Sequence, residues 1–190
     1  MILRSGDTPS GVYLVRRGFV RNYSMTLDGK ELTLVIYSRD DFFPVMWAIH
    51  KMVVVYNFEA MTAAEIWCAP RGAFLTFINQ NPDVMSDFLS SVSFRFAGIL
   101  ERLTHMTYGN ALTKVASLIS ILTMRFGVKK GKSIVIGMPL THHEIASLVG
   151  MARETVSIEM EKLIKMGALE VKHKTITVKK ARILRKLAEY

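Results

Sequence analysis

The segment that most constrains the fold runs from residue 140 to residue 169 and predicts two short helices joined by a tight turn. Thr141 and Glu144 have the spacing of a capping box, in which each side chain bonds a free backbone N–H at the helix start. Gly150 supplies the left-handed residue that ends the first helix, and Arg153 opens the second. The apolar residues at helical spacing are expected to face inward, and they are Ile145, Ala146, Leu148, Val149, Val156, Met160, Leu163 and Ile164.

The outward side chains at the start of the second helix can all hydrogen-bond to base edges or phosphates, and they are Arg153, Glu154, Thr155 and Ser157. This is the layout of a helix-turn-helix whose second helix enters the DNA major groove. An ordinary helical hairpin would show the same apolar spacing. The residues that follow favour DNA binding, because 170–172 and 175–178 predict a lysine-rich hairpin with a polar turn. Together the segments predict a winged helix.

The positive charge is concentrated in the same part of the chain. The net charge is +9, and residues 128–190 hold 13 Lys or Arg against 6 Asp or Glu. A basic surface is the electrostatic footprint that phosphate binding requires. Without the predicted helix-turn-helix, a solvated lysine-rich surface would be the simpler interpretation.

Several classes of protein are excluded by composition. The sequence has no run of about 18 apolar residues, so we expect no membrane span. It has no apolar segment of a signal peptide after Met1. Cys68 is the single cysteine, which excludes an internal disulfide and a cluster held by four cysteines of these residues. We therefore expect a cytoplasmic protein.

Residues 1–80 predict short strands with frequent turns, typical of a β-barrel or jelly roll. β-Branched and aromatic residues alternate between turn dipeptides, of which Asp28-Gly29 is a strong hairpin signal. Strands are expected at 12–15, 19–23, 32–37, 52–56, 58–62 and 65–68, with a short helix at 73–78. The fold class is therefore α+β, with an effector-type barrel over 1–80.

After Pro82, the spacing of the apolar residues becomes that of a helix. One stripe with steps of three or four contains Phe88, Val92, Phe96, Ile99, Leu103 and Met106. Its length of about 37 Å, at 1.5 Å per residue, exceeds what a small barrel covers. The stripe therefore predicts a dimerisation helix over 81–108 in a homodimer, although part of it is expected to pack on the barrel.

Residues 109–190 form the predicted winged-helix domain. Tyr108-Gly109-Asn110 interrupts the helical pattern and suggests a hinge. A helix is expected at 111–126, then a basic segment at 127–132 and a strand at 133–137.

This order of parts resembles the CRP/FNR family of bacterial transcription regulators. Arg153-Glu154-Thr155-Val156-Ser157 is close to the family's recognition-helix motif, and Asn81-Pro82-Asp83 resembles the start of its dimer helix. Similar barrel segments are found at 2–7, 12–18, 28–31 and 40–43. The resemblance implies a homodimer that binds an inverted repeat in double-stranded DNA and contacts RNA polymerase. Family members usually carry further residues ahead of the position of Ile2.

The cyclic-AMP members of the family hold the ligand phosphate with a Gly-Glu pair and an Arg-Ser pair. The first pair falls here on Pro44 and Val45, and the second falls near Val54 and Val55. An arginine and backbone donors are what hold a cyclic phosphate. The family's adenine-binding Thr-Ser pair falls on apolar residues, Ile99 and Leu100. We therefore expect no control by cyclic AMP.

The corresponding effector pocket would be apolar, lined by Met46, Trp47, His50, Met52, Tyr56, Phe58, Ile99, Leu100 and Leu103. These side chains either fill the barrel or bind an apolar effector. Haem is a further alternative, because some family members sense gases that way. His50 is the only barrel histidine, with Cys68, Met46 and Met52 as possible soft ligands. No cofactor and no other metal site is predicted.

The resemblance also assigns DNA contacts. Arg153 would contact guanine or phosphate, Glu154 would accept from cytosine, and Ser157 would reach thymine or phosphate. Ile158 stands where the family usually has a second arginine, so the family's usual half-site is not assured. Phosphate contacts are expected from Thr141, His142 and His143 at a helix N-terminus, and from Lys172, His173 and Lys174 in the wing. Arg182, Arg185 and Lys186 belong to a final helix.

An enzyme is the competing class, because cupin-like barrels often host metal oxygenases. Such sites need two or three histidines with a carboxylate. Residues 1–80 contain only His50, and no Ser-His-Asp or Cys-His set is evident. The sequence therefore predicts a regulator and no enzyme, and it leaves open whether that regulator has an effector and whether it activates or represses.

Overall fold

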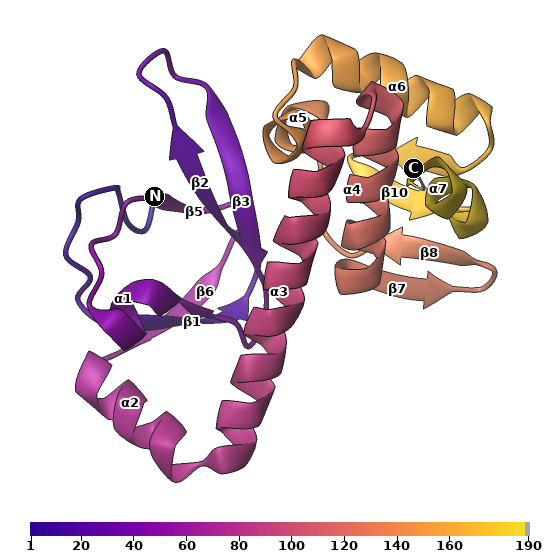
Figure 1. The fold of residues 1–190 in the computed structure, drawn as a ribbon. Coiled ribbons are helices and arrows are strands. Elements are labelled where there is room, and N and C mark those ends of the chain that lie inside the picture. The colour runs from indigo at the N-terminus through magenta and orange to yellow at the C-terminus, as the bar shows by residue number, and fades with distance from the viewer. Residues whose placement is uncertain (189–190) are drawn as a thin grey trace. The chain divides into compact units, whose positions relative to one another are not determined.

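A computed structural model describes residues 1–188, without the side chain of Tyr108. The chain forms two compact units, Met1–Ala97 and Gly98–Tyr190, each described below by itself. The expected α+β fold class is confirmed, with a β-sheet unit first, then a long helix and a winged helix-turn-helix (Figure 1). The long helix α3 (Pro82–Tyr108) contributes to both units.

The first unit contains two antiparallel three-stranded sheets, with strand orders β4-β1-β6 and β3-β2-β5. Its elements are β1 (Val12–Arg17), β2 (Val20–Met25), β3 (Glu31–Tyr37), β4 (Phe42–Phe43), α1 (Val45–His50), β5 (Asn57–Ala60), β6 (Glu65–Ala69) and α2 (Arg71–Gln80). The two sheets enclose an aromatic core in which Phe43 stacks on Phe58 at 5.1 Å between ring centroids. Tyr13 and Tyr37 pack on the same phenylalanine, Phe43.

The strand predicted at Met52–Tyr56 is wrong. These residues form a connecting segment, which begins after Lys51 ends α1 with a left-handed φ of 55°. The carbonyl of Val54 accepts a hydrogen bond from Gly6 N at 2.7 Å, and no strand of the described residues pairs with the segment. A β-branched run forms a strand only where a neighbouring strand offers the hydrogen bonds.

A buried ion pair fixes α3 within the first unit. The guanidinium of Arg95 donates to the Asp41 carboxylate, and both side chains are more than nine-tenths buried. Ser91 hydrogen-bonds the same carboxylate at 3.1 Å, and the Ser38 backbone N–H donates to it at 2.8 Å. One carboxylate therefore joins α3 to the turn that precedes β4.

Helix α3 is apolar on two sides, so the predicted stripe needs correction. Phe88 faces inward, where it meets Phe42 and Phe74 edge-on. The exposed apolar face instead contains Leu89, Phe96, Leu100 and Leu103, at steps of seven, four and three residues. Two successive steps of four, from Phe88 to Phe96, drift about 80° around a helix of 3.6 residues per turn. The predicted stripe therefore passes from the inner face to the outer one.

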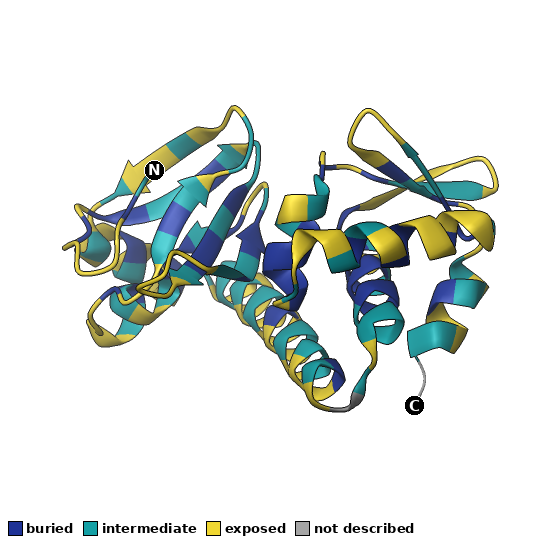
Figure 2. Ribbon diagram, turned by 90° about the horizontal axis from the view of Figure 1, so that it is seen from above, coloured by how far each residue is buried: buried dark blue, intermediate teal, exposed yellow. Residues whose placement is uncertain are grey.

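The second unit surrounds helix α4 (Ala111–Phe126), whose residues are largely buried (Figure 2). Asn110 caps this helix by accepting a hydrogen bond from Thr113 N at 2.9 Å. The remaining elements are β7 (Gly127–Lys130), β8 (Ser133–Ile136), α5 (His142–Val149), α6 (Arg153–Lys165), β9 (Leu169–Lys172), β10 (Thr175–Val178) and α7 (Ala181–Ala188). The sheet has the order β7-β8-β10-β9. The predicted break between the helices lies at Gly109 and Asn110, since Tyr108 is the last residue of α3, and its action as a hinge stays a prediction.

Replacement of Arg95 tests the buried ion pair. Arg95→Ala should lower the free energy of unfolding by about 3–5 kcal/mol, because Asp41 would remain buried without its cationic partner. Urea unfolding followed by tryptophan fluorescence measures this loss, since Trp47 and Trp67 both lie in the first unit. Arg39→Ala is the control, because its pair with Asp40 is mostly exposed and should be worth at most about 1 kcal/mol. Equal losses in the two variants would contradict the assignment.

Candidate nucleic-acid interface

The helix-turn-helix has the predicted local geometry. The Thr141 backbone N–H donates to the Glu144 carboxylate at 2.5 Å, and Glu144 N–H donates to the Thr141 hydroxyl at 3.2 Å. Both halves of the capping box are therefore present. Gly150 ends α5 with a φ of 65°, the left-handed conformation that glycine adopts without steric cost. Ala152 precedes α6, and three residues, Gly150 to Ala152, make the turn.

The inward side of α6 is formed by Val156, Met160 and Leu163, all fully buried. The inward placement predicted for Ile164 is wrong, since 40% of this residue is exposed. Positions 156, 160 and 163 share one face, and position 164 lies about 100° further around the helix. Glu159 is also buried, and its carboxylate accepts from the Lys162 ammonium at 2.9 Å.

The outward side of α6 begins with Arg153 and Glu154, both exposed, and continues one turn later with exposed Ile158. Thr155 is half-buried. Neither Arg153 nor Glu154 forms an ion pair within residues 1–188. Their charged groups are therefore available to a ligand.

Ser157 and His142, both assigned to DNA by the sequence, are bonded to each other. The Ser157 hydroxyl lies 2.7 Å from His142 Nδ1 and donates to the Arg153 carbonyl at 3.0 Å. Either atom can be the donor in the bond between Ser157 and His142, depending on the histidine tautomer. Both hydrogen-bond contacts of the Ser157 hydroxyl are thus made within the protein. The pair joins α5 to α6, and its contact with DNA stays a prediction.

The wing is the hairpin of β9 and β10, in which Lys172 opposes Thr175. His173 and Lys174 form its two-residue turn, with φ of 46° and 66°, the positive values that a type I′ turn requires. Leu140 N donates to the Lys174 carbonyl at 2.8 Å. This bond places the wing tip next to the residue that precedes the capping box.

Glu170 neutralises part of the wing's positive charge. Its carboxylate accepts from the Lys172 ammonium at 2.5 Å and from Lys179 at 2.6 Å. These two hydrogen bonds lower the pKa of Glu170 from 4.5 to about 2, and the same contact raises the pKa of Lys172. Lys172 is thus engaged with an acid, whereas Lys174 at the tip has no ion-pair partner in the part of the chain that the structure describes.

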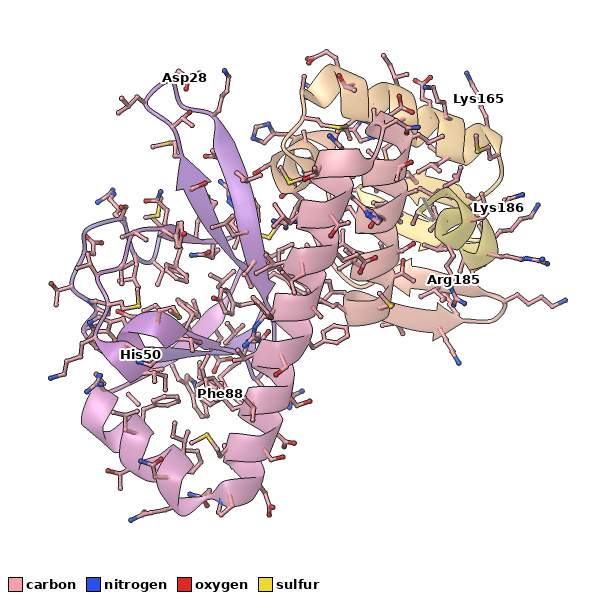
Figure 3. All side chains as sticks on the ribbon, viewed as in Figure 1. Asp28, His50, Phe88, Lys165, Arg185 and Lys186 are labelled. Carbon is pink, nitrogen blue, oxygen red and sulfur yellow. The ribbon has the colours of Figure 1, made fainter. Side chains whose placement is uncertain are left out.

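A second basic hairpin was missed from the sequence. The segment 127–132 was expected only to be basic, but Gly127–Lys130 pairs with Ser133–Ile136. Gly131 makes the turn with a φ of 61°. A glycine between lysines was therefore the sequence signal from which this hairpin could have been predicted. Its exposed lysines are Lys129, Lys130 and Lys132. Lys165 of α6 and Arg185 and Lys186 of α7, labelled in Figure 3, are exposed as well.

The residues predicted to line an effector pocket in the barrel have different surroundings. Phe58 is buried in the aromatic core and Trp47 packs against that core. The exposed members are Met46, His50, Met52, Tyr56, Leu100 and Leu103, and Ile99 is half-buried. Whether any of these residues binds an effector or haem stays a prediction.

The structure thus defines a winged-helix DNA-binding protein with an N-terminal β-sheet unit. Residues 1–81 match the cyclic nucleotide-binding domain family, and residues 113–187 match the Crp-like helix-turn-helix domain family. The chain belongs to the CRP/FNR family of transcription regulators.

The chain is similar over most of its length to known regulators and to a solved structure. The global nitrogen regulator of Nostoc sp. is 28% identical over 92% of this chain and 79% of its own length. The cyclic AMP receptor protein of Thermus thermophilus is 26% identical over 98% of this chain and 83% of its own. A CooA mutant from Carboxydothermus hydrogenoformans has a similar fold, with a TM-score of 0.81 at 24% identity, over all of this chain and 84% of that one. Within residues 1–188, the helices lack the length and hydrophobicity that a membrane span requires.

Acid titration of Glu170 tests the charge arrangement of the wing. Because the folded pKa lies below the ordinary value, the two ion pairs stabilise the fold fully above about pH 4.5, and the effect disappears as pH falls towards 2. The NMR chemical shift of the Glu170 carboxyl carbon should therefore report a pKa of about 2. The double replacement Lys172→Met and Lys179→Met should return the pKa towards 4.5, and Lys162→Met should leave it unchanged. An ordinary pKa in the parent protein would contradict the arrangement.

Proposed function

We propose that this regulator binds an inverted repeat as a homodimer, with α6 of each protomer in the DNA major groove. The capped helix pair carries the proposal, because it buries one side of α6 and leaves Arg153 and Glu154 unpaired on the other. Recognition helices of a dimer are about 34 Å apart, one turn of B-DNA. RNA polymerase is the partner that family membership suggests.

Base and phosphate contacts come from different parts of the interface. Arg153 has the donors to bind a guanine edge, and Glu154 has the acceptor for a cytosine amino group. Lys174 at the wing tip supplies a phosphate contact without sequence information. The N-terminus of α5 favours phosphate through its free backbone N–H groups.

Dimerisation uses the exposed apolar face of α3. Leu89, Phe96, Leu100 and Leu103 recur at the spacing of a coiled-coil seam, in which such residues insert between those of a partner helix. A face of this kind would be unfavourable in water if it stayed uncovered. A second copy of α3 provides a matching face.

Regulation does not involve cyclic AMP. Pro44 and Val45, at the start of α1, offer neither the glutamate nor the glycine of the family's cyclic-AMP members. The second pair falls near Val54, which is buried, and Val55, which is exposed, and neither residue supplies the arginine that the family's cyclic-AMP members use. Isothermal titration with cyclic AMP should show no binding, and DNA affinity should be unchanged by it.

Selection of bound duplexes from a random pool tests the DNA interface. The parent protein should enrich an inverted repeat. Glu154→Ala should then lose base preference at one position in each half-site, by about 1–3 kcal/mol. Lys174→Ala should weaken all sequences alike and reduce the salt slope by about one unit. If Glu154→Ala discriminates among bases as well as the parent does, the assignment of Glu154 is wrong.

Two neighbouring phenylalanines of α3 provide a matched test of the dimer. Phe96 lies on the exposed seam and is 59% exposed, whereas Phe94 lies on another side of α3 and is 50% exposed. Phe96→Glu should shift the protein to monomers in analytical ultracentrifugation, because two carboxylates would be buried opposite each other. Phe94→Glu should leave the dimer intact. Monomers in both variants, or in neither, would rule out this seam.

A further inference from the structure

An isoleucine occupies the centre of the outward face of α6. Ile158 lies one turn after Glu154 and three residues before Glu161, and 56% of it is exposed. Its neighbours on this side are charged, and Glu161 pairs with Lys165 at 4.0 Å. Ile158 therefore interrupts a charged surface with an apolar one.

The fold of the second unit does not explain this isoleucine. Val156, Met160 and Leu163 already bury the inner side of α6. A β-branched residue has a lower helix propensity than lysine, arginine or glutamate at an exposed position. Single exposed apolar residues are common on protein surfaces. What distinguishes Ile158 is its position in the half of the helix that enters the groove.

The chemistry of the major groove limits what Ile158 can recognise. Its side chain has no donor or acceptor, so it cannot bond the N7, O6, O4 or amino groups of the base edges. The C5 methyl of thymine is the one apolar group that the four base pairs present there. Contact with a cytosine amino group or a guanine edge would instead desolvate a polar group without replacing its hydrogen bonds.

We infer that Ile158 is a specificity-determining residue that selects a T·A pair in each half-site by burying the thymine methyl. The inference rests on the proposed DNA-binding function and adds a base contact to those of Arg153 and Glu154. Glu154 and Ile158 lie one turn apart on the same face, so they contact neighbouring base pairs. The half-site therefore combines a hydrogen-bonded position with one recognised by apolar contact.

Deoxyuridine in synthetic duplexes of the selected repeat provides the test, because uracil differs from thymine only in lacking the C5 methyl. At one thymine of the half-site, uracil should weaken binding by the full-length parent protein about 4-fold per half-site, the change expected from one buried methyl. Ile158→Ala should be insensitive to uracil at that position, and Ile158→Val should remain sensitive. Affinities are measured by fluorescence anisotropy at fixed salt.

Ile164 supplies the matched control, since it is a second exposed isoleucine of α6 on a different side of the helix. Ile164→Ala should show the parent's sensitivity to uracil, and thermal unfolding should be alike in both alanine variants. A parent that binds the repeat but is indifferent to uracil at every thymine would overturn the inference. So would equal sensitivity in Ile158→Ala, because another residue would then contact the methyl. A parent that selects no repeat would instead refute the proposed function.

Discussion

The burial of Val156, Met160 and Leu163 is the constraint on which the DNA-binding unit depends. These side chains are fully buried where α6 packs on α4 and α5. Rotation of α6 by one residue, about 100°, would expose them and bury charged groups. The apolar side of the helix thereby decides which polar side chains are presented outward. In the proposed complex, specificity for bases would follow from this packing on the opposite side of α6.

The features predicted correctly from the sequence are local. The Thr141–Glu144 capping box and the left-handed Gly150 depend on residues within about one turn of each other, and those residues are visible as a motif. The wing could also be predicted, because its strands are separated by only two residues. Met52–Tyr56 has the composition of a strand, but no strand of the described residues pairs with it. The β7–β8 hairpin is as local as the wing, and it was missed because Gly127–Lys130 is exposed along its whole length and has no alternation of apolar and polar residues.

The candidate site was partly predictable for the same reason. Arg153 and Glu154 were placed outward correctly by helical periodicity. The bond between Ser157 and His142 crosses from one helix to another, and residue type alone favoured DNA contact for both. On α3, periodicity identified an apolar stripe but could not separate Phe88, which the aromatic cluster of the first unit covers, from Phe96, which is exposed. Which of the two apolar faces of a helix is covered can be decided only when the elements packed on that helix are known.

The bond between His142 and Ser157 has a consequence for the thermodynamics of DNA binding. It links α5 to α6 in the free protein, and the capping box orders the start of α5. Little conformational entropy is then left to lose when these helices meet a duplex. The exposed lysines of the wing are different, because immobilising each long side chain costs about 0.5–1.5 kcal/mol. The phosphate contacts therefore contribute less to the free energy of binding than their number suggests. The contacts made by the pre-organised α6 carry a smaller entropy cost.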